Sequence, residues 1–388
     1  MIKKKIVSDW FLFLLLSPIL FFYIATFLFK NNELFETISI YLRLIVPFML
    51  VVFSTFEYLS VKIYKLQSLA IFTILIFCCV IFFTKINEGI LIDSEGRSSL
   101  SYFVNVNILN FSYFVWGSLF ANYLHVKENT IFFKVLILIF LILLVNISLD
   151  TFSIDYYKLS LKNNYNLKSH LGYTDFYFVV AFFSYNSTRS KNVKRIIITI
   201  FFLGLFFLGG RSAFVFSLIP YVLIYHRKNY VLISLSFLTS IILFIVYSRQ
   251  IFTVTSDDFS LLERFSFNEG FFTFYRQNIF KHSINTVILI ERDLGKHVHN
   301  FLSYLEAYGI LGFSIILVLL RSVYNKLTLL KKSIAKQNLM FLFFYIFAQF
   351  IFSKTISWVY LWLLLGVLIG MYYKVKQEQG NLITKSII

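Results

Sequence analysis

Long apolar runs separated by shorter polar segments dominate the pattern of this chain. The runs lie at about 10–29, 38–56, 67–84, 103–124, 131–149, 172–186, 193–210, 212–226, 229–248, 299–320, 337–353 and 355–373. An α-helix needs roughly 20 apolar residues to cross the hydrocarbon core of a bilayer, and these runs reach or approach that length. The pattern therefore predicts an all-α polytopic membrane protein with about twelve transmembrane helices.

Composition and charge point the same way. Hydrophobic residues make up 59% of the chain, charged residues only 14%, and the mean hydropathy is +0.77. Water-soluble packing cannot hide that much apolar surface, so a soluble globular class is excluded. The formal net charge of +17 could suggest a nucleic acid partner, but the basic residues stand in short clusters between the apolar runs. Such clusters are typical of cytoplasmic topology signals, and no nucleic acid partner is expected.

The distribution of the basic clusters predicts the orientation. With a cytoplasmic N-terminus, the inner segments hold nearly all of them, whereas the outer short turns hold little besides Lys30 and Lys354. Both termini are therefore expected in the cytoplasm. Segment 249–298 is then the largest outward-facing loop, and its many aromatic residues argue for short interfacial helices rather than disorder. We divide the chain into N-terminal transmembrane helices, a region that carries most candidate residues together with loop 249–298, and C-terminal helices with a cytoplasmic tail: 1–194, 195–320 and 321–388.

The segment Gly209-Gly210-Arg211-Ser-Ala stands between two of these runs. Glycine removes side-chain obstruction, and arginine offers a forked pair of donors. Backbone amides and the guanidinium can therefore approach one anion together, and phosphate is the obvious candidate. The alternative is a turn whose arginine snorkels to the membrane interface.

Three further arginines are candidates for substrate binding. Loop 249–298 holds six basic and six acidic residues, which excludes a uniformly cationic binding surface. Arg264 and Arg276 would therefore bind only as individually positioned side chains, and the alternative for each is a solvated or salt-bridged surface charge. Arg43 interrupts the second apolar run. A charge inside a membrane is a functional candidate because its burial is costly, and snorkelling is again the alternative.

A histidine directly follows the outward loop. His299 and Asn300 stand at the mouth of the tenth apolar run, and Glu306 lies seven residues after His299, two turns further along one helix face. A neutral imidazole can take a proton from a sugar hydroxyl near pH 7, whereas the alternative is a capping or interfacial histidine. His297 and His299 could suggest a metal pair, but no third ligand has a suggestive spacing, so no metal is expected.

Taken together, these motifs resemble the O-antigen ligase/polymerase superfamily. The resemblance rests on Gly-Gly-Arg211-Ser-Ala opening a helix, then Arg276-x-x-x-Phe280 and Asp293-Leu-Gly295 in an outward loop, then His299-Asn300 and Gly309-x-x-Gly312, and it covers about residues 195–320. Two features depart from the family pattern. Eight residues rather than nine separate Asn300 from Gly309, and Phe280 stands where the family tends to have tryptophan. The first departure turns Gly309 by about 100° around its helix, which affects the role of that glycine more than that of His299.

The resemblance implies a metal-independent transferase of the large polytopic GT-C-like glycosyltransferase class, without a cofactor. It implies a multi-pass protein of the bacterial inner (cytoplasmic) membrane whose active site faces the periplasm. Arg211 and Arg276 would hold the diphosphate of an undecaprenyl-diphosphate-linked oligosaccharide, and His299 would activate the acceptor hydroxyl. The remaining candidates for substrate binding are Arg264, Asn300, Glu306 and Arg43.

The leading hypothesis is an O-antigen polymerase of lipopolysaccharide biosynthesis. Such an enzyme moves a growing glycan from undecaprenyl diphosphate onto a lipid-linked repeat unit within membrane lipid, and a chain-length regulator is a further conceivable partner. The alternative is the ligase, which moves the glycan onto the lipid A core; the 50 Phe and 25 Tyr favour the polymerase by resemblance alone. A second alternative is a polysaccharide transporter or flippase, for which twelve helices with both termini inside is a common layout.

Overall fold

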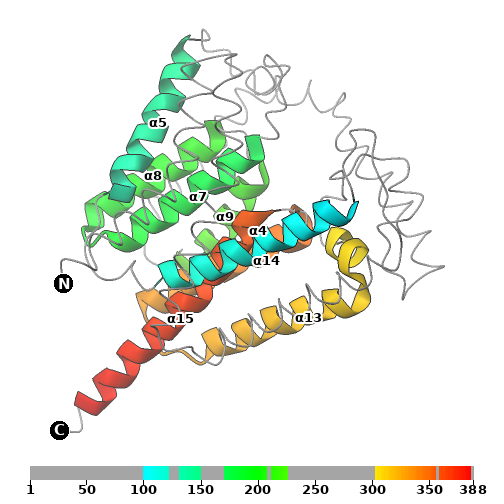
Figure 1. The fold of residues 1–388 in the computed structure, drawn as a ribbon. Coiled ribbons are helices and arrows are strands. Elements are labelled where there is room, and N and C mark those ends of the chain that lie inside the picture. The colour runs from blue at the N-terminus through cyan, green and yellow to red at the C-terminus, as the bar shows by residue number, and fades with distance from the viewer. Residues whose placement is uncertain are drawn as a thin grey trace, which may run out of the picture. The chain divides into compact units, whose positions relative to one another are not determined.

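The computed structural model of the chain describes residues 99–121, 131–149, 170–207, 211–225, 302–354 and 358–385. Within these ranges the chain is helical and contains no strand (Figure 1). The helices are α4 (Ser99–Phe120), α5 (Ile131–Leu149), α7 (His170–Ser187), α8 (Lys191–Phe207), α9 (Arg211–Tyr225), α13 (Leu302–Thr328), α14 (Ile334–Phe352) and α15 (Val359–Lys385). The predicted α-helical class is thus confirmed for this part of the chain, and the runs at 10–29, 38–56, 67–84 and 229–248 lie outside it.

Two helical segments are long and apolar enough to cross a membrane, judged by length and composition in the described part of the chain. They are Ile334–Phe352 in α14 and Val359–Gln377 in α15, and shorter apolar stretches occur at Phe132–Leu144 and Ser212–Tyr221. The expected total of about twelve spans remains a prediction.

Helix α5 is largely apolar on its buried side and also on its exposed side, where Lys134 is the charged residue. Phe132, Leu136 and Ile139 recur at helical spacing and are buried, while Leu138 and Leu141 on another side are about half exposed. A surface helix of a soluble protein would carry polar residues on its exposed side. The composition of α5 therefore fits an apolar surrounding.

The described helices fall into two compact units. One holds α5, α7, α8 and α9, and the other holds α4 as far as Ser118 together with α13, α14 and α15. In the first unit α7 packs on both α5 and α8, and α9 packs on α8.

Aromatic packing and one hydrogen bond fix the register of the first unit. The hydroxyl of Tyr177 on α7 donates to the carbonyl oxygen of Ile200 on α8 at 2.8 Å. The ring of Tyr177 occupies the space above Gly204, where a Cβ atom would collide with it. Phe202 on α8 contacts Phe214 and Tyr221 on α9, with ring centroids 5.8 and 5.6 Å apart. Helices α7 and α8, and likewise α8 and α9, therefore pack as antiparallel neighbours.

Serine residues begin two of the helices. The Ser333 hydroxyl accepts from the backbone N–H of Lys336 at 3.1 Å, and the Ser190 hydroxyl accepts from Val193 at 3.5 Å. Such caps satisfy backbone donors that the first helical turn leaves without a partner. In addition, the Lys336 ammonium donates to the carbonyl oxygens of Thr328 at 2.6 Å and Leu330 at 2.7 Å, where α13 ends. A tight connection between α13 and α14 follows.

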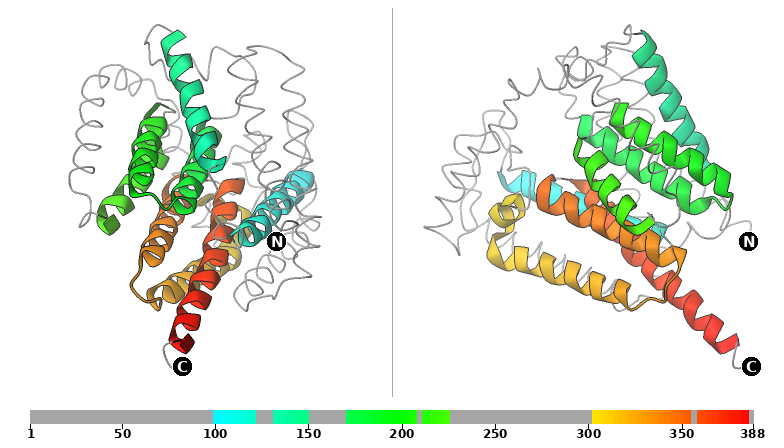
Figure 2. Two further views of the ribbon diagram at one scale, coloured as in Figure 1. Left: turned by 90° about the vertical axis from the view of Figure 1, so that its left-hand side faces the viewer. Right: turned by 180° about the vertical axis from the view of Figure 1, so that it is seen from behind.

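The second unit contains a close crossing of α4 and α15. A Cβ atom added to Gly117 would meet the carbonyl oxygen of Leu363, and one added to Gly366 would meet the carbonyl oxygen of Phe114 and, at 2.8 Å, the backbone nitrogen of Ser118. Only glycine lets the two backbones approach this closely. Figure 2 shows α13 and α14 running antiparallel in the same unit, so the start of α13 and the end of α14 share one end.

Candidate functional site

Arg211 begins helix α9, as the sequence pattern predicts. The first four backbone N–H groups of a helix have no partner inside it, and the helix dipole favours negative charge at this point. The backbone at Arg211 therefore suits an anion such as phosphate. The arginine side chain itself lies outside the described part of the structure.

A buried carboxylate lies at the same end of the first unit. Because α7, α8 and α9 alternate in direction, the first turns of α7 and α9 share one end of this unit. Thr174 and Asp175 lie just before Tyr177 on α7, toward this end, and are 0% and 2% exposed. Asp175 was not among the candidate residues predicted from the sequence. The signal was present, because an acidic residue inside a predicted span is a functional candidate by the same argument that selected Arg43.

Tyr304 anchors the start of α13 in the second unit. Its ring is fully buried and lies 4.5 Å from the ring of Phe350 near the end of α14, measured between centroids. Further along, the rings of Tyr324 and Phe343 are 5.5 Å apart, so α13 and α14 run in opposite directions. Helix α13 begins at Leu302, three residues after His299. Three residues of chain span at most about 11 Å.

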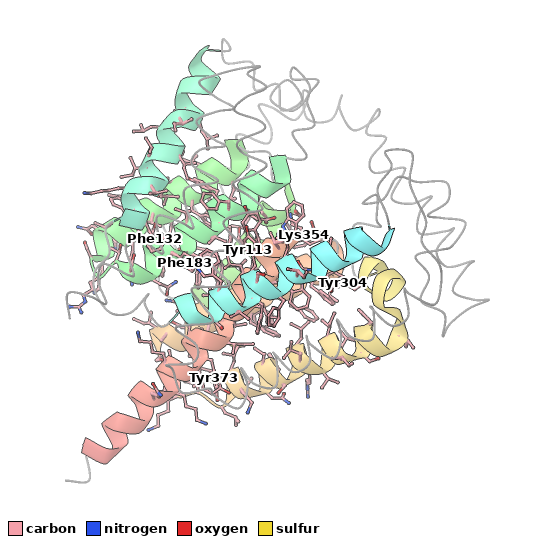
Figure 3. The ribbon with its side chains drawn as sticks, viewed as in Figure 1. Tyr113, Phe132, Phe183, Tyr304, Lys354 and Tyr373 are labelled. Atoms are coloured by element: carbon pink, nitrogen blue, oxygen red, sulfur yellow. The ribbon has the colours of Figure 1, made fainter. Side chains whose placement is uncertain are left out.

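A buried lysine lies at this same end of the second unit. Lys354 follows α14 and is 2% exposed. Its ammonium lies 4.0 Å from the centroid of the Trp358 ring, which is within the range of a cation–π interaction. Its backbone N–H donates to the carbonyl oxygen of Gln349 at 2.8 Å. Figure 3 shows Lys354 and Tyr304 in this part of the unit.

Two further buried polar side chains lie before and after this lysine in the sequence. Gln349 is in the last turn of α14 and Trp362 in the first turn of α15. The Oε1 and Nε2 atoms of Gln349 and the Nε1 atom of Trp362 are buried and have no hydrogen-bond partner. From the sequence, Lys354 was expected only as a basic residue of an outer turn, like Lys30, and Gln349 and Trp362 were not predicted, because burial of this kind is decided by tertiary packing.

Most residues predicted from sequence fall outside the described part of the chain. His299, Asn300, Arg276, Arg264 and Arg43 do so entirely. Arg211 and Glu306 are placed on α9 and α13 by their backbones alone. None of these residues has a side chain in the described part of the structure, and their roles remain predictions.

Within the described ranges no group of three His, Cys, Asp or Glu residues could hold a metal ion. Because His297 and His299 lie outside those ranges, the metal-free expectation also remains a prediction.

No protein-family model, curated protein or solved structure matches this chain. The family resemblance therefore rests on the sequence motifs.

Proposed function

We propose that this protein is an O-antigen polymerase of a bacterial inner membrane. It transfers a growing glycan from undecaprenyl diphosphate onto a lipid-linked repeat unit at the periplasmic face. The observation that carries the proposal is the order of motifs along the chain: Gly-Gly-Arg211 opening a helix, then a long polar loop, then His299-Asn300 just before a second helix. Helix starts at Arg211 and Leu302 are consistent with this order.

The membrane part of the proposal draws support from the apolar helices. Both Ile334–Phe352 and Val359–Gln377 have the length and composition of a membrane span. Large apolar side chains are also exposed on several helices, among them Val318, which is 68% exposed. Exposed apolar surface on this scale is typical of a lipid-facing or partner-facing surface.

The proposed reaction is a glycosyl transfer with one proton transfer. The acceptor hydroxyl gives its proton to the His299 imidazole, and its oxygen forms a bond to the anomeric carbon of the donor glycan. The bond between that carbon and the diphosphate oxygen breaks, and undecaprenyl diphosphate leaves with the bonding electron pair. A histidine whose pKa lies near neutrality is suited to general-base catalysis of this kind.

Arginine can stabilise the leaving group in place of a metal ion. In this proposal Arg211 and Arg276 donate hydrogen bonds to the diphosphate, whose negative charge grows as the bond breaks. A guanidinium keeps its charge at any physiological pH and pairs with two oxygens at once. Fixed donors aimed at developing charge supply much of the rate enhancement in enzymes.

Lipopolysaccharide from a deletion strain tests the proposal. Loss of a polymerase leaves a single repeat unit on the lipid A core, and this is the expected result. Absence of any O-antigen on the core, with long lipid-linked chains accumulating, would instead identify a ligase. Unaltered lipopolysaccharide, or repeat units trapped on the cytoplasmic side, would contradict both transferases.

A further inference from the structure

At the end of the second unit where α14 stops and α15 starts, some buried polar groups have no hydrogen-bond partner. Gln349 is 1% exposed, and neither atom of its amide has a hydrogen-bond partner; the same is true of the Trp362 indole N–H. Buried polar groups in folded proteins are nearly always hydrogen-bonded, so each exception needs an explanation. A ligand that completes these bonds is one such explanation.

Lys354 adds a positive charge to the same place. It lies between Gln349 and Trp362 in sequence, it is buried, and its ammonium rests over the Trp358 ring. Burial of a charged group is costly and is seldom kept without a functional or structural use. The three side chains come from the last turn of one helix, the connection after it and the first turn of the next.

The donor and acceptor chemistry of these groups indicates the class of ligand. The Gln349 amide has two donor hydrogens and one acceptor oxygen, whereas the indole and the ammonium only donate. An ionised diphosphate only accepts and would leave the glutamine oxygen without a partner. A sugar ring has hydroxyls that donate and accept, so it can complete the hydrogen bonds of the Gln349 amide and the Trp362 indole and can also accept from the ammonium.

We propose that Gln349, Lys354 and Trp362 bind a sugar of the acceptor glycan. This inference rests on the proposed function, because it uses the position of His299 close in sequence to the start of α13. Tyr304 on α13 contacts Phe350 on α14, and so the start of α13 and Gln349 lie at one end of the unit. An acceptor sugar held there would have its neighbouring hydroxyl near the chain segment that carries the general base.

The test measures saccharide binding and turnover separately. The probe is a single repeat-unit oligosaccharide, released by mild acid from the lipid-linked oligosaccharide of the source cell, and inorganic diphosphate is the comparison probe. Thermal unfolding is followed for purified wild type and for Gln349→Met, Trp362→Phe and His299→Ala. Gln337→Met is the matched control, because Gln337 lies at the opposite end of α14.

Saccharide should raise the unfolding midpoint of wild type, His299→Ala and Gln337→Met by at least about 2 °C, and that of Gln349→Met much less. Without ligand, Gln349→Met should unfold at the wild-type temperature or above, because it replaces an amide that lacks partners by an apolar side chain of similar shape. In the transfer assay its KM for the acceptor should rise about tenfold, with kcat nearly unchanged. If Gln349→Met does not fold, Trp362→Phe should show the same loss of the saccharide shift and the same rise in KM, at a somewhat lower unfolding temperature without ligand, because the smaller ring leaves a cavity.

Each remaining outcome decides one of the two proposals. A wild-type protein that saccharide does not stabilise overturns the sugar site, whatever its turnover. An equal shift in Gln349→Met also overturns it and assigns the amide to bound water. If only diphosphate raises the unfolding midpoint, and the rise depends on Gln349, the site binds the donor diphosphate and not an acceptor sugar. If saccharide raises the unfolding midpoint in a way that depends on Gln349, but the protein has no transferase activity, the sugar site stands and the polymerase proposal is wrong.

Discussion

At the scale of single residues, Arg211 joins a fixed positive charge to the start of a helix. If it binds diphosphate through a forked pair of hydrogen bonds, lysine should substitute poorly although it keeps the charge, because a point charge lacks the planar donor pair. We expect Arg211→Lys to lose polymerised glycan at a normal protein level, measured as the lipopolysaccharide ladder of a complemented deletion strain.

Arg195→Lys is the matched control for this substitution. Arg195 is an exposed residue on α8, near the end opposite to the start of α9. Its replacement should leave the ladder unchanged. A wild-type ladder from Arg211→Lys as well would reduce Arg211 to an interfacial anchor.

Tyr177 supplies a prediction about stability at the same scale. Its hydroxyl makes the 2.8 Å hydrogen bond from α7 to the Ile200 carbonyl oxygen on α8. Tyr177→Phe should lower the free energy of unfolding by about 1 kcal/mol, the usual net value of a buried hydrogen bond. Denaturant unfolding in mixed micelles measures this change. Tyr324→Phe should change it by less than about 0.5 kcal/mol, and equal losses in the two variants would contradict the assigned role of the bond.

The candidate site was only partly predictable at this scale. The sequence motif predicted the helix start at Arg211, because two glycines followed by a renewed apolar run are a local signal. Gln349 carried no such signal, since a glutamine in an apolar run does not reveal whether its amide is satisfied. Asp175 could have been selected from its position inside a run, but its burial depends on contacts between α7 and its neighbours.

At the scale of helices, the sequence predicted the helices that the structure describes, while some ends differ. Helix α5 has the predicted bounds of 131–149, because it begins and ends with apolar residues and Lys134 is its one charged residue. Helices α13 and α15 continue to Thr328 and Lys385, whereas the apolar runs stop near 320 and 373. Hydropathy marks only the apolar part of a helix, and residues such as Arg321 and Lys326 continue the helix because arginine and lysine are good helix formers.

The crossing of α4 and α15 is the most sensitive contact between helices. Both partners at Gly366 are backbone atoms, which cannot rotate away as a side chain could. We expect Gly366→Leu to force the two helices apart and to destabilise the protein by about 3 kcal/mol or more, which a fall in monodisperse protein after detergent extraction would reveal.

Ser314→Leu is the matched control, because it adds the same side chain to an exposed position on α13. It should be extracted like wild type. A Gly366→Leu protein with the wild-type yield and unfolding temperature would contradict the close crossing.

At the scale of the whole molecule, the orientation is the first question. The charge distribution predicts that loop 249–298 faces outward and that the connection between α7 and α8 faces the cytoplasm. After replacement of Cys78 and Cys79 by alanine, a cysteine at Ser256 should react with a membrane-impermeant thiol reagent in spheroplasts. A cysteine at Ser190, which is exposed in the structure, should react only after permeabilisation. The reverse pattern would overturn the orientation and with it the proposed mechanism.

The proposed transfer reaction depends most directly on His299. If His299 is the general base, His299→Ala removes a proton transfer that contributes roughly 10²–10⁴ to the rate, while the arginines still hold the donor. Glu306→Gln should have a milder effect, because two helical turns separate it from His299 by a rise of about 10 Å.

The decisive measurement is turnover of purified wild type and His299→Ala with lipid-linked repeat unit, each with and without a chelator. We predict glycan polymerisation by wild type that is insensitive to chelation, and a rate for His299→Ala that is at least about a hundredfold lower. Retention of more than about a tenth of the wild-type rate would remove His299 from the mechanism. Loss of wild-type activity on chelation would contradict the metal-free transfer.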